Sequence, residues 1–121
     1  MNILFSVIIP LYQKGPFIAR AIESVLCQTY KEFELIVIDD GSTDNGANIV
    51  EQITDHRLTL IRQENRGVSA ARNKGISLAK GDYIGLLDAD DKWEADFLME
   101  MKRLIETYPG CGWYSSSGWI R

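Results

Sequence analysis

At 121 residues, 45% of them hydrophobic, the chain has the size of one domain or of part of a larger one, with enough apolar side chains for a packed core. Its formal net charge of −4 excludes the overall positive field with which proteins hold nucleic acid or an anionic membrane, so a polyanionic ligand would have to be held locally. The two cysteines, Cys27 and Cys111, form no CxxC motif and no His/Cys cluster. This argues against a disulfide framework and a zinc site, and makes a reducing cytosol the expected compartment.

The N-terminal apolar run, residues 3–11, is too short to span a membrane and contains Pro10. We therefore interpret it as a first strand rather than a signal peptide. Its β-branched centre, 5–10, is typical of a strand buried on both faces of a parallel sheet. Pro16 suits the first turn of a helix, and apolar side chains recur at helical spacing over about 16–28.

A second buried strand is predicted over 35–38, and it runs directly into Asp39 and Asp40. Ser42 is the expected N-cap of a short second helix that follows the turn. A third strand is predicted over 58–61.

The next helix, predicted from Val68 onward, carries small residues that would let it pack close to a sheet. A fourth buried strand is predicted over 83–87, followed at once by three aspartates within four residues. The last of these, Asp91, is the expected cap of a fourth helix that Pro109 and Gly110 end. The tail, 111–121, alternates in the manner of a strand.

Strands that alternate with helices predict an α/β fold: an open, mostly parallel sheet with right-handed crossovers and helices on both faces, in the manner of a Rossmann domain. Ligands of such sheets bind beyond the carboxyl ends of the strands, where the strand order reverses. Three unusual clusters fall at predicted strand ends: 10–12, 39–40 and 88–91. If the first strand is central, with the second on one side and the fourth on the other, these clusters line one crevice.

Asp88 and Asp90 form a DxD motif at a strand end. Carboxylates this close repel one another unless water, hydrogen-bond donors or a cation lies among them. Hard oxygen ligands suit Mg²⁺ or Mn²⁺ rather than zinc or copper. The alternative is structural: Asp91 caps a helix, and Asp88 and Asp90 are solvated.

Asp39 and Asp40 could accept hydrogen bonds from a nucleobase imide or a ribose hydroxyl, or could be solvated turn acids. Arg72 lies about one turn into the third predicted helix, from which a guanidinium could reach a base carbonyl or a phosphate. Its alternative role is a surface ion pair with a carboxylate.

Taken together, the motifs resemble those of family 2 glycosyltransferases, in the same order and over nearly the whole chain. They are VIIPLY at 7–12, QTY at 28–30, ELIVIDDGSTD at 34–44, NRGVSAARNKG at 65–75 and LLDADD at 86–91. Gln13 stands where the family usually has Asn, and a slightly altered base pocket is expected there.

The resemblance implies a GT-A fold, a nucleotide-diphosphate sugar as donor, most often UDP-linked, and Mn²⁺ or Mg²⁺ as cofactor. It makes Asp39 the nucleobase-binding acid, Arg72 an arginine that helps to hold the nucleotide, and Asp90 the metal ligand. The remaining donor-site residues that it implies are the wall of the base pocket, Pro10, Leu11 and Tyr12; the acid near the ribose, Asp88; and the supporting neighbours, Asp40 and Asp91.

By the same resemblance, residues 1–121 are a single partial GT-A domain, the donor-binding half, from which the acceptor half is missing. Inverting members take their general base from that second half, so the base is expected outside this chain, and the fragment alone is expected to be inactive. The resemblance places the parent protein in polysaccharide biosynthesis, at the inner face of the membrane, with an unknown acceptor.

Two other classes compete with this interpretation. One is a non-catalytic nucleotide-binding or interaction module that self-associates through uncovered sheet edge and helix faces. The other is a phosphotransfer receiver domain. The receiver domain is disfavoured because the acid pair follows the second predicted strand rather than the first, and because no later strand ends in lysine.

Overall fold

A computed structural model describes residues 2–110 of the chain, and its strands and helices alternate as the sequence predicts. In chain order the elements are β1 (Phe5–Leu11), α1 (Gly15–Leu26), β2 (Phe33–Asp40), α2 (Gly46–Glu51), β3 (Leu58–Gln63), α3 (Val68–Leu78), β4 (Tyr83–Leu86) and α4 (Phe97–Thr107). Among the described residues, no helix is long and apolar enough to cross a membrane.

The four strands form one parallel sheet in the order β3-β2-β1-β4. This confirms the predicted arrangement, with β1 central, β2 on one side and β4 on the other. Leu11 at the end of β1 pairs with Asp39 of β2, and Asp40 pairs with Gln63 of β3. The register therefore brings the acids of β2 to the same edge of the sheet as the end of β1.

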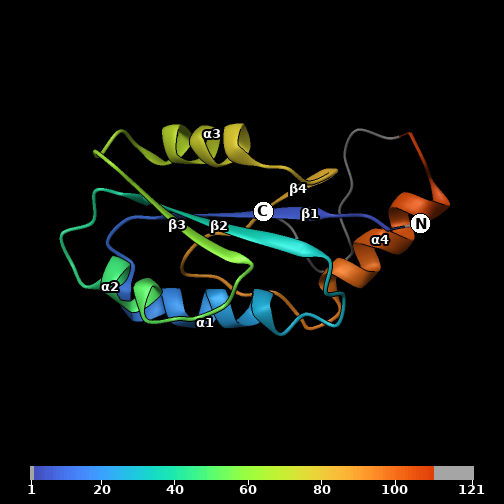
Figure 1. Ribbon diagram of the computed structural model, residues 1–121, viewed down its shortest axis with the longest axis horizontal. Coiled ribbons are helices and arrows are strands. Elements are labelled where there is room, and N and C mark those ends of the chain that lie inside the picture. Colours follow the sequence, from blue (N-terminus) through green and yellow to red (C-terminus); the bar gives the residue numbers. More distant parts are fainter. Residues whose placement is uncertain (1, 111–121) are drawn as a thin grey trace.

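Helices cover both faces of the sheet, as predicted: α3 lies on one face, and α1 and α2 lie on the other (Figure 1). The larger core packs Val7 and Ile9 of β1 against α1 and α4. A smaller core, which includes Ile8 and Ile38, lies under α3. Every residue of β1 is buried, because adjacent residues of a central strand point to opposite, covered faces.

The α3 helix approaches the sheet closely, and Gly75 explains how. A Cβ atom at Gly75 would lie 2.4 Å from Cγ2 of Ile8, a distance that a side chain could not occupy. The prediction that small residues let this helix pack close to the sheet is thus confirmed. The close approach brings the first turn of α3 over the carboxyl end of β1.

The predicted cap of the fourth helix was wrong. The α4 helix begins at Phe97, with Asp96 at the N-cap position, and Asp91 Oδ1 instead accepts the N–H of Lys92. The buried Gln28 accounts for this late start: its Oε1 accepts the N–H of Leu98, one of the donors that a helix start leaves unpaired. A side chain distant in sequence supplies the contact that a local cap would have made.

Ser42 is likewise not a helix cap. The α2 helix begins at Gly46, whose N–H donates to Asp44 Oδ1 at 3.0 Å, and Asn45 occupies the N-cap position. The Ser42 hydroxyl oxygen instead accepts the N–H of Gln13 from the turn after β1. The turn after β2 therefore serves to hold the end of β1, and the helix starts later.

The fourth strand is less buried than predicted. It ends at Leu86, and Ile84 and Leu86 are 41% and 37% exposed, whereas Leu87 just beyond it is fully buried. The reason is position, since β4 is an edge strand within the described range 2–110. The predicted fifth strand, 111–121, lies outside the described residues.

Candidate functional site

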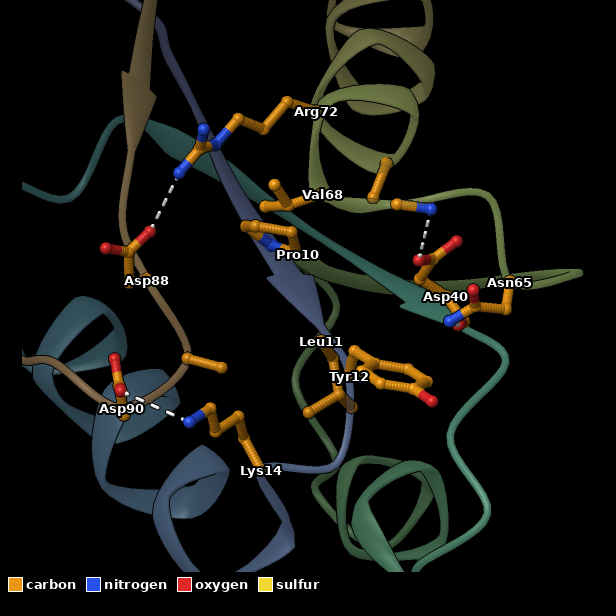
Figure 2. Close-up of a pocket in the computed structure, with 13 residues that line it drawn as sticks. Pro10, Leu11, Tyr12, Lys14, Asp40, Asn65, Val68, Arg72, Asp88 and Asp90 are labelled. Carbon is orange, nitrogen blue, oxygen red and sulfur yellow. Dashed lines mark hydrogen bonds and ion pairs between the residues drawn. The ribbon is translucent and has the colours of Figure 1, made fainter.

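A cavity of about 500 Å³ opens at the carboxyl ends of β1, β2 and β4, beside the first turn of α3 (Figure 2). Its size is typical of a small-molecule site, and its place in the sheet is the one expected for a ligand of an open parallel fold. It unites most of the residues that the sequence singled out: Pro10, Leu11, Tyr12, Asp40, Arg72, Asp88 and Asp90.

The two acids that end β2 do not share a location. Asp40 lines the cavity, whereas Asp39, expected to bind a nucleobase, is not among the lining residues. Both are buried, and Asp39 Oδ1 accepts the N–H of Ser42 at 3.2 Å within the turn. Adjacent strand residues point to opposite faces of a sheet, so only one of the pair could face the α3 side.

Asp40 is held by three donors from β3 and the loop after it. Its Oδ1 accepts Gln63 Nε2 at 2.8 Å and the N–H of Arg66 at 2.9 Å, and its Oδ2 accepts the N–H of Gly67 at 2.9 Å. Burial raises the pKa of Asp40, but these hydrogen bonds outweigh it and hold the pKa below the ordinary value. The carboxylate is therefore ionised at neutral pH, and Oδ2 still has capacity to accept another donor.

Arg72 and Asp88 form an ion pair between α3 and the turn after β4. Nη2 of Arg72 lies 3.1 Å from Oδ1 of Asp88, and both groups line the cavity. Nε of Arg72 is buried and has no hydrogen-bond partner within residues 2–110. The guanidinium as a whole lines the cavity and is partly exposed, so it is suited to an anionic or carbonyl ligand.

Asp90 is held from two sides by cationic side chains of the α1 region. Lys14 Nζ lies 3.5 Å from Oδ2 of Asp90, and Arg20 Nη2 donates to the backbone oxygen of Asp90 at 3.0 Å. Lys14 also lines the cavity, although it was not among the residues predicted for the site. The one available signal was its place three residues after the end of β1, within reach of a ligand bound there.

Figure 2 shows how the charges are arranged. The Arg72–Asp88 and Lys14–Asp90 pairs lie on one side of the cavity, Asp40 and Asn65 lie on the other, and Pro10, Leu11 and Tyr12 lie between them. Tyr12 is exposed, which leaves its ring free to pack against a ligand. The arrangement separates an end with a single carboxylate from an end with paired charges.

Gln13 does not alter this cavity in the way expected. Its side chain points to the turn after β2, where Nε2 donates to Thr43 Oγ1 at 2.8 Å and Oε1 accepts the N–H groups of Thr43 and Asp44. It is not among the lining residues. Gln13 therefore fixes the turn that carries its neighbours Tyr12 and Lys14.

The acids fit a divalent ion only if a ligand shares it. In the described part of the chain, no group of three or more His, Cys, Asp or Glu residues could hold a metal ion. Asp88 is engaged by Arg72, whereas the carboxylate of Asp90 already has a cation, the Lys14 ammonium, beside it. Mg²⁺ and Mn²⁺ suit such a place, because hard cations of this kind bind through one or two carboxylates together with phosphate oxygens and water.

Comparison with known proteins gives a family match over most of the chain. The model described as "Glycosyl transferase family 2" matches residues 6–116. Among curated relatives, glycosyltransferase GlyG of Streptococcus pneumoniae is 45% identical over 94 residues, which are 75% of this chain and 31% of that protein. The uncharacterized glycosyltransferase EpsJ of Bacillus subtilis is 38% identical over 120 residues, 94% of this chain and 35% of that protein.

Solved structures match the fold as well. S. aureus TarS 1-349 in complex with UDP is 30% identical, with a TM-score of 0.80, over 85% of this chain and 32% of that one. The mannosyltransferase PcManGT from Pyrobaculum calidifontis, in complex with GDP-Man and Mn²⁺, is 30% identical with a TM-score of 0.77, over 84% of this chain and 32% of that one. The chain thus spans about a third of the length of these relatives.

Proposed function

The chain belongs to glycosyl transferase family 2, and from this premise we propose that its cavity binds the nucleotide diphosphate of an activated sugar, which the whole protein transfers to an acceptor. One observation carries the proposal: a single cavity at the strand ends unites Asp40, Arg72 and the DxD acids Asp88 and Asp90. Of these similar structures, TarS has been solved with UDP and with UDP-GlcNAc, and PcManGT with GDP-Man.

We assign the nucleobase to the Asp40 end of the cavity. Asp40 Oδ2 can accept the imide N–H of a uracil, and the exposed ring of Tyr12 lies near enough to form a wall for the base. This proposal gives Asp40 the role that the family resemblance implied for Asp39. A uridine nucleotide is the proposed donor, since one carboxylate acceptor complements the single imide donor of uracil.

The diphosphate belongs at the opposite end, beside Arg72 and Asp90. The Arg72 guanidinium would donate to the nucleotide, and Asp88 would lie near the ribose. Asp90 would hold a Mn²⁺ or Mg²⁺ ion together with the diphosphate. When bound, such an ion stabilises the negative charge that gathers on the leaving diphosphate.

We propose an inverting transfer, with the acceptor activated by a carboxylate base from the part of the protein beyond this chain. The residues of this cavity would bind the donor alone. On this proposal the chain binds nucleotide without turning it over.

Isothermal titration calorimetry tests the donor site. UDP with Mn²⁺ is titrated into the wild type, into Asp90→Asn and into Glu23→Gln, a control for carboxylate-to-amide exchange on the exposed side of α1. We expect binding by the wild type and the control, and loss of the Mn²⁺-dependent part in Asp90→Asn. Equal heats for all three proteins would show that Asp90 is not the metal ligand. A wild type that binds no UDP would show that the cavity is not a donor site.

A second candidate function, a self-associating module, is favoured by one observation. Ile84 and Leu86 are exposed on β4, an edge strand within the described residues, and exposed apolar edges tend to pair. Sedimentation velocity at several concentrations tests it. A protein that remains monomeric throughout would rule out this alternative.

A further inference from the structure

Lys14 places a positive charge at the end of the cavity where the metal ligand lies. It precedes the first residue of α1, and its Nζ lies 3.5 Å from Oδ2 of Asp90. Both side chains are about half exposed. An ion pair with this much solvent contact contributes little to stability, so it can be exchanged for another partner at small cost.

The backbone of Lys14 is held by hydrogen bonds, whereas its ammonium makes a half-exposed ion pair. Its carbonyl accepts the N–H groups of Phe17 and Ile18 at 3.0 Å, and the N–H of Gly15 donates to Asp44 Oδ2 at 2.9 Å. The flexible four-carbon stem can therefore swing while its point of attachment stays on the cavity wall.

A divalent ion that binds Oδ2 of Asp90 would compete there with the Lys14 ammonium. A divalent ion and an ammonium group at the same carboxylate oxygen would repel each other. A diphosphate brings negative oxygens to the same end, and a lysine ammonium is a strong donor to phosphate. A metal ion that displaces Lys14 from Asp90 would thus leave the lysine without a partner, unless a nucleotide is present whose diphosphate can accept its hydrogen bond.

We propose that Lys14 is an exchangeable counter-ion: it occupies the Asp90 carboxylate in the free protein and moves to the diphosphate when a metal ion takes its place. This inference rests on the proposed donor site. It makes the binding of metal and of nucleotide mutually favourable, because the metal competes with Lys14 when it binds alone and no longer does so once the diphosphate engages the lysine.

The test compares Lys14→Met with Lys31→Met, which removes the same charge at an exposed position before β2, at the other end of that strand from the cavity. Free Mn²⁺ is measured by electron paramagnetic resonance, and UDP and uridine are titrated by calorimetry.

For Lys14→Met we expect Mn²⁺ alone to bind roughly threefold tighter. With Mn²⁺ present, UDP should bind about tenfold more weakly, because a charged hydrogen bond to phosphate is lost. Uridine, which has no phosphate, should bind as it does to the wild type, and Lys31→Met should match the wild type with all three probes.

Exchange predicts that Lys14→Met binds Mn²⁺ more tightly than the wild type and binds UDP more weakly. Weaker binding of both, unchanged binding of both, or a loss for uridine as large as for UDP would overturn the proposal. A Lys14→Arg variant guards against misfolding: it keeps the charge and should bind UDP within a few-fold of the wild type, and a loss equal to that of Lys14→Met would overturn the role of charge. If the wild type binds UDP but these differences are missing, only the role of Lys14 fails; if it binds no UDP, the donor site fails with it.

Discussion

Arg72 Nη2 donates to Asp88 Oδ1 at 3.1 Å, and this contact joins the second turn of α3 to the turn after β4 across the mouth of the cavity. The side chains are 36% and 48% exposed, so solvent screens their attraction. Arg72 also lines the cavity. The pair is therefore better placed to present the guanidinium to a ligand than to stabilise the fold.

We expect Arg72→Ala to separate binding from stability. The free energy of unfolding should fall by no more than about 1 kcal/mol, as for other exposed ion pairs. The affinity for UDP should fall about tenfold, because charged hydrogen bonds to the ligand are lost. Urea denaturation and calorimetry measure the two quantities.

The matched control for that change is Arg62→Ala. Arg62 is paired with Glu51 between β3 and α2, with both side chains about half exposed, and it does not line the cavity. We expect the same small loss of stability without a loss of UDP affinity. If both variants bound UDP as the wild type does, the role of Arg72 in the donor site would be wrong.

Acid should destabilise the fold through Asp55, which lies before β3 at the end of the sheet away from the cavity. Its carboxylate accepts three hydrogen bonds from Arg57, which come from Nε, Nη2 and the backbone N–H. These hydrogen bonds lower the pKa of Asp55 from 3.8 to about 2. A pKa lower in the folded state means that the stabilisation is complete above pH 3.8 and is lost as pH falls through about 2. The pair should contribute about 2 kcal/mol at neutral pH.

Urea denaturation between pH 7 and pH 2 measures this dependence. We expect Asp55→Asn to lose about 1–2 kcal/mol at neutral pH and to show a flatter decline in acid. Glu23→Gln on the exposed side of α1 should keep the slope of the wild type. An Asp55→Asn profile parallel to that of the wild type would show that the acid sensitivity arises elsewhere.

The sheet could be predicted because its strands carry strong local signals. The buried runs of β1 and β2, with a helix after each, determine parallel pairing, and the acids at the strand ends mark the edge where the cavity opens. Which acid faces the cavity could not be predicted, since Asp39 and Asp40 are adjacent and the sequence does not say on which face the cavity lies.

Contacts between distant segments account for the other differences. Gln28 supplies the acceptor at the start of α4, so Asp91 does not cap it. Lys14 and Asp90 are 76 positions apart in the chain, and no local sequence pattern marks such a pair. The exposure of β4 follows from its place at the edge of the sheet, which an apolar run alone does not reveal.

Gln13 combines a strained backbone conformation with a side-chain clamp, by which we mean the hydrogen bonds of its amide group to Thr43 and Asp44. Substitutions at this position can separate the two effects. Its φ of 55° lies in the left-handed region, which is costly for most residues with a side chain. Its amide nevertheless holds Thr43 and Asp44, and its N–H donates to Ser42 Oγ. The hydrogen bonds of the clamp offset the cost of the backbone conformation.

We therefore expect Gln13→Ala to lose about 2 kcal/mol of unfolding free energy, because the clamp disappears while the strain remains. Gln13→Gly loses the same clamp but relieves the strain, so it should be about 1 kcal/mol more stable than the alanine variant. Urea denaturation of both variants beside the wild type measures the difference. Equal stabilities for Gln13→Ala and Gln13→Gly would mean that the turn relaxes to a negative φ once the side-chain amide is removed. In that case the UDP affinity of both variants should fall equally, because Tyr12 and Lys14, on either side of Gln13, would leave the cavity together.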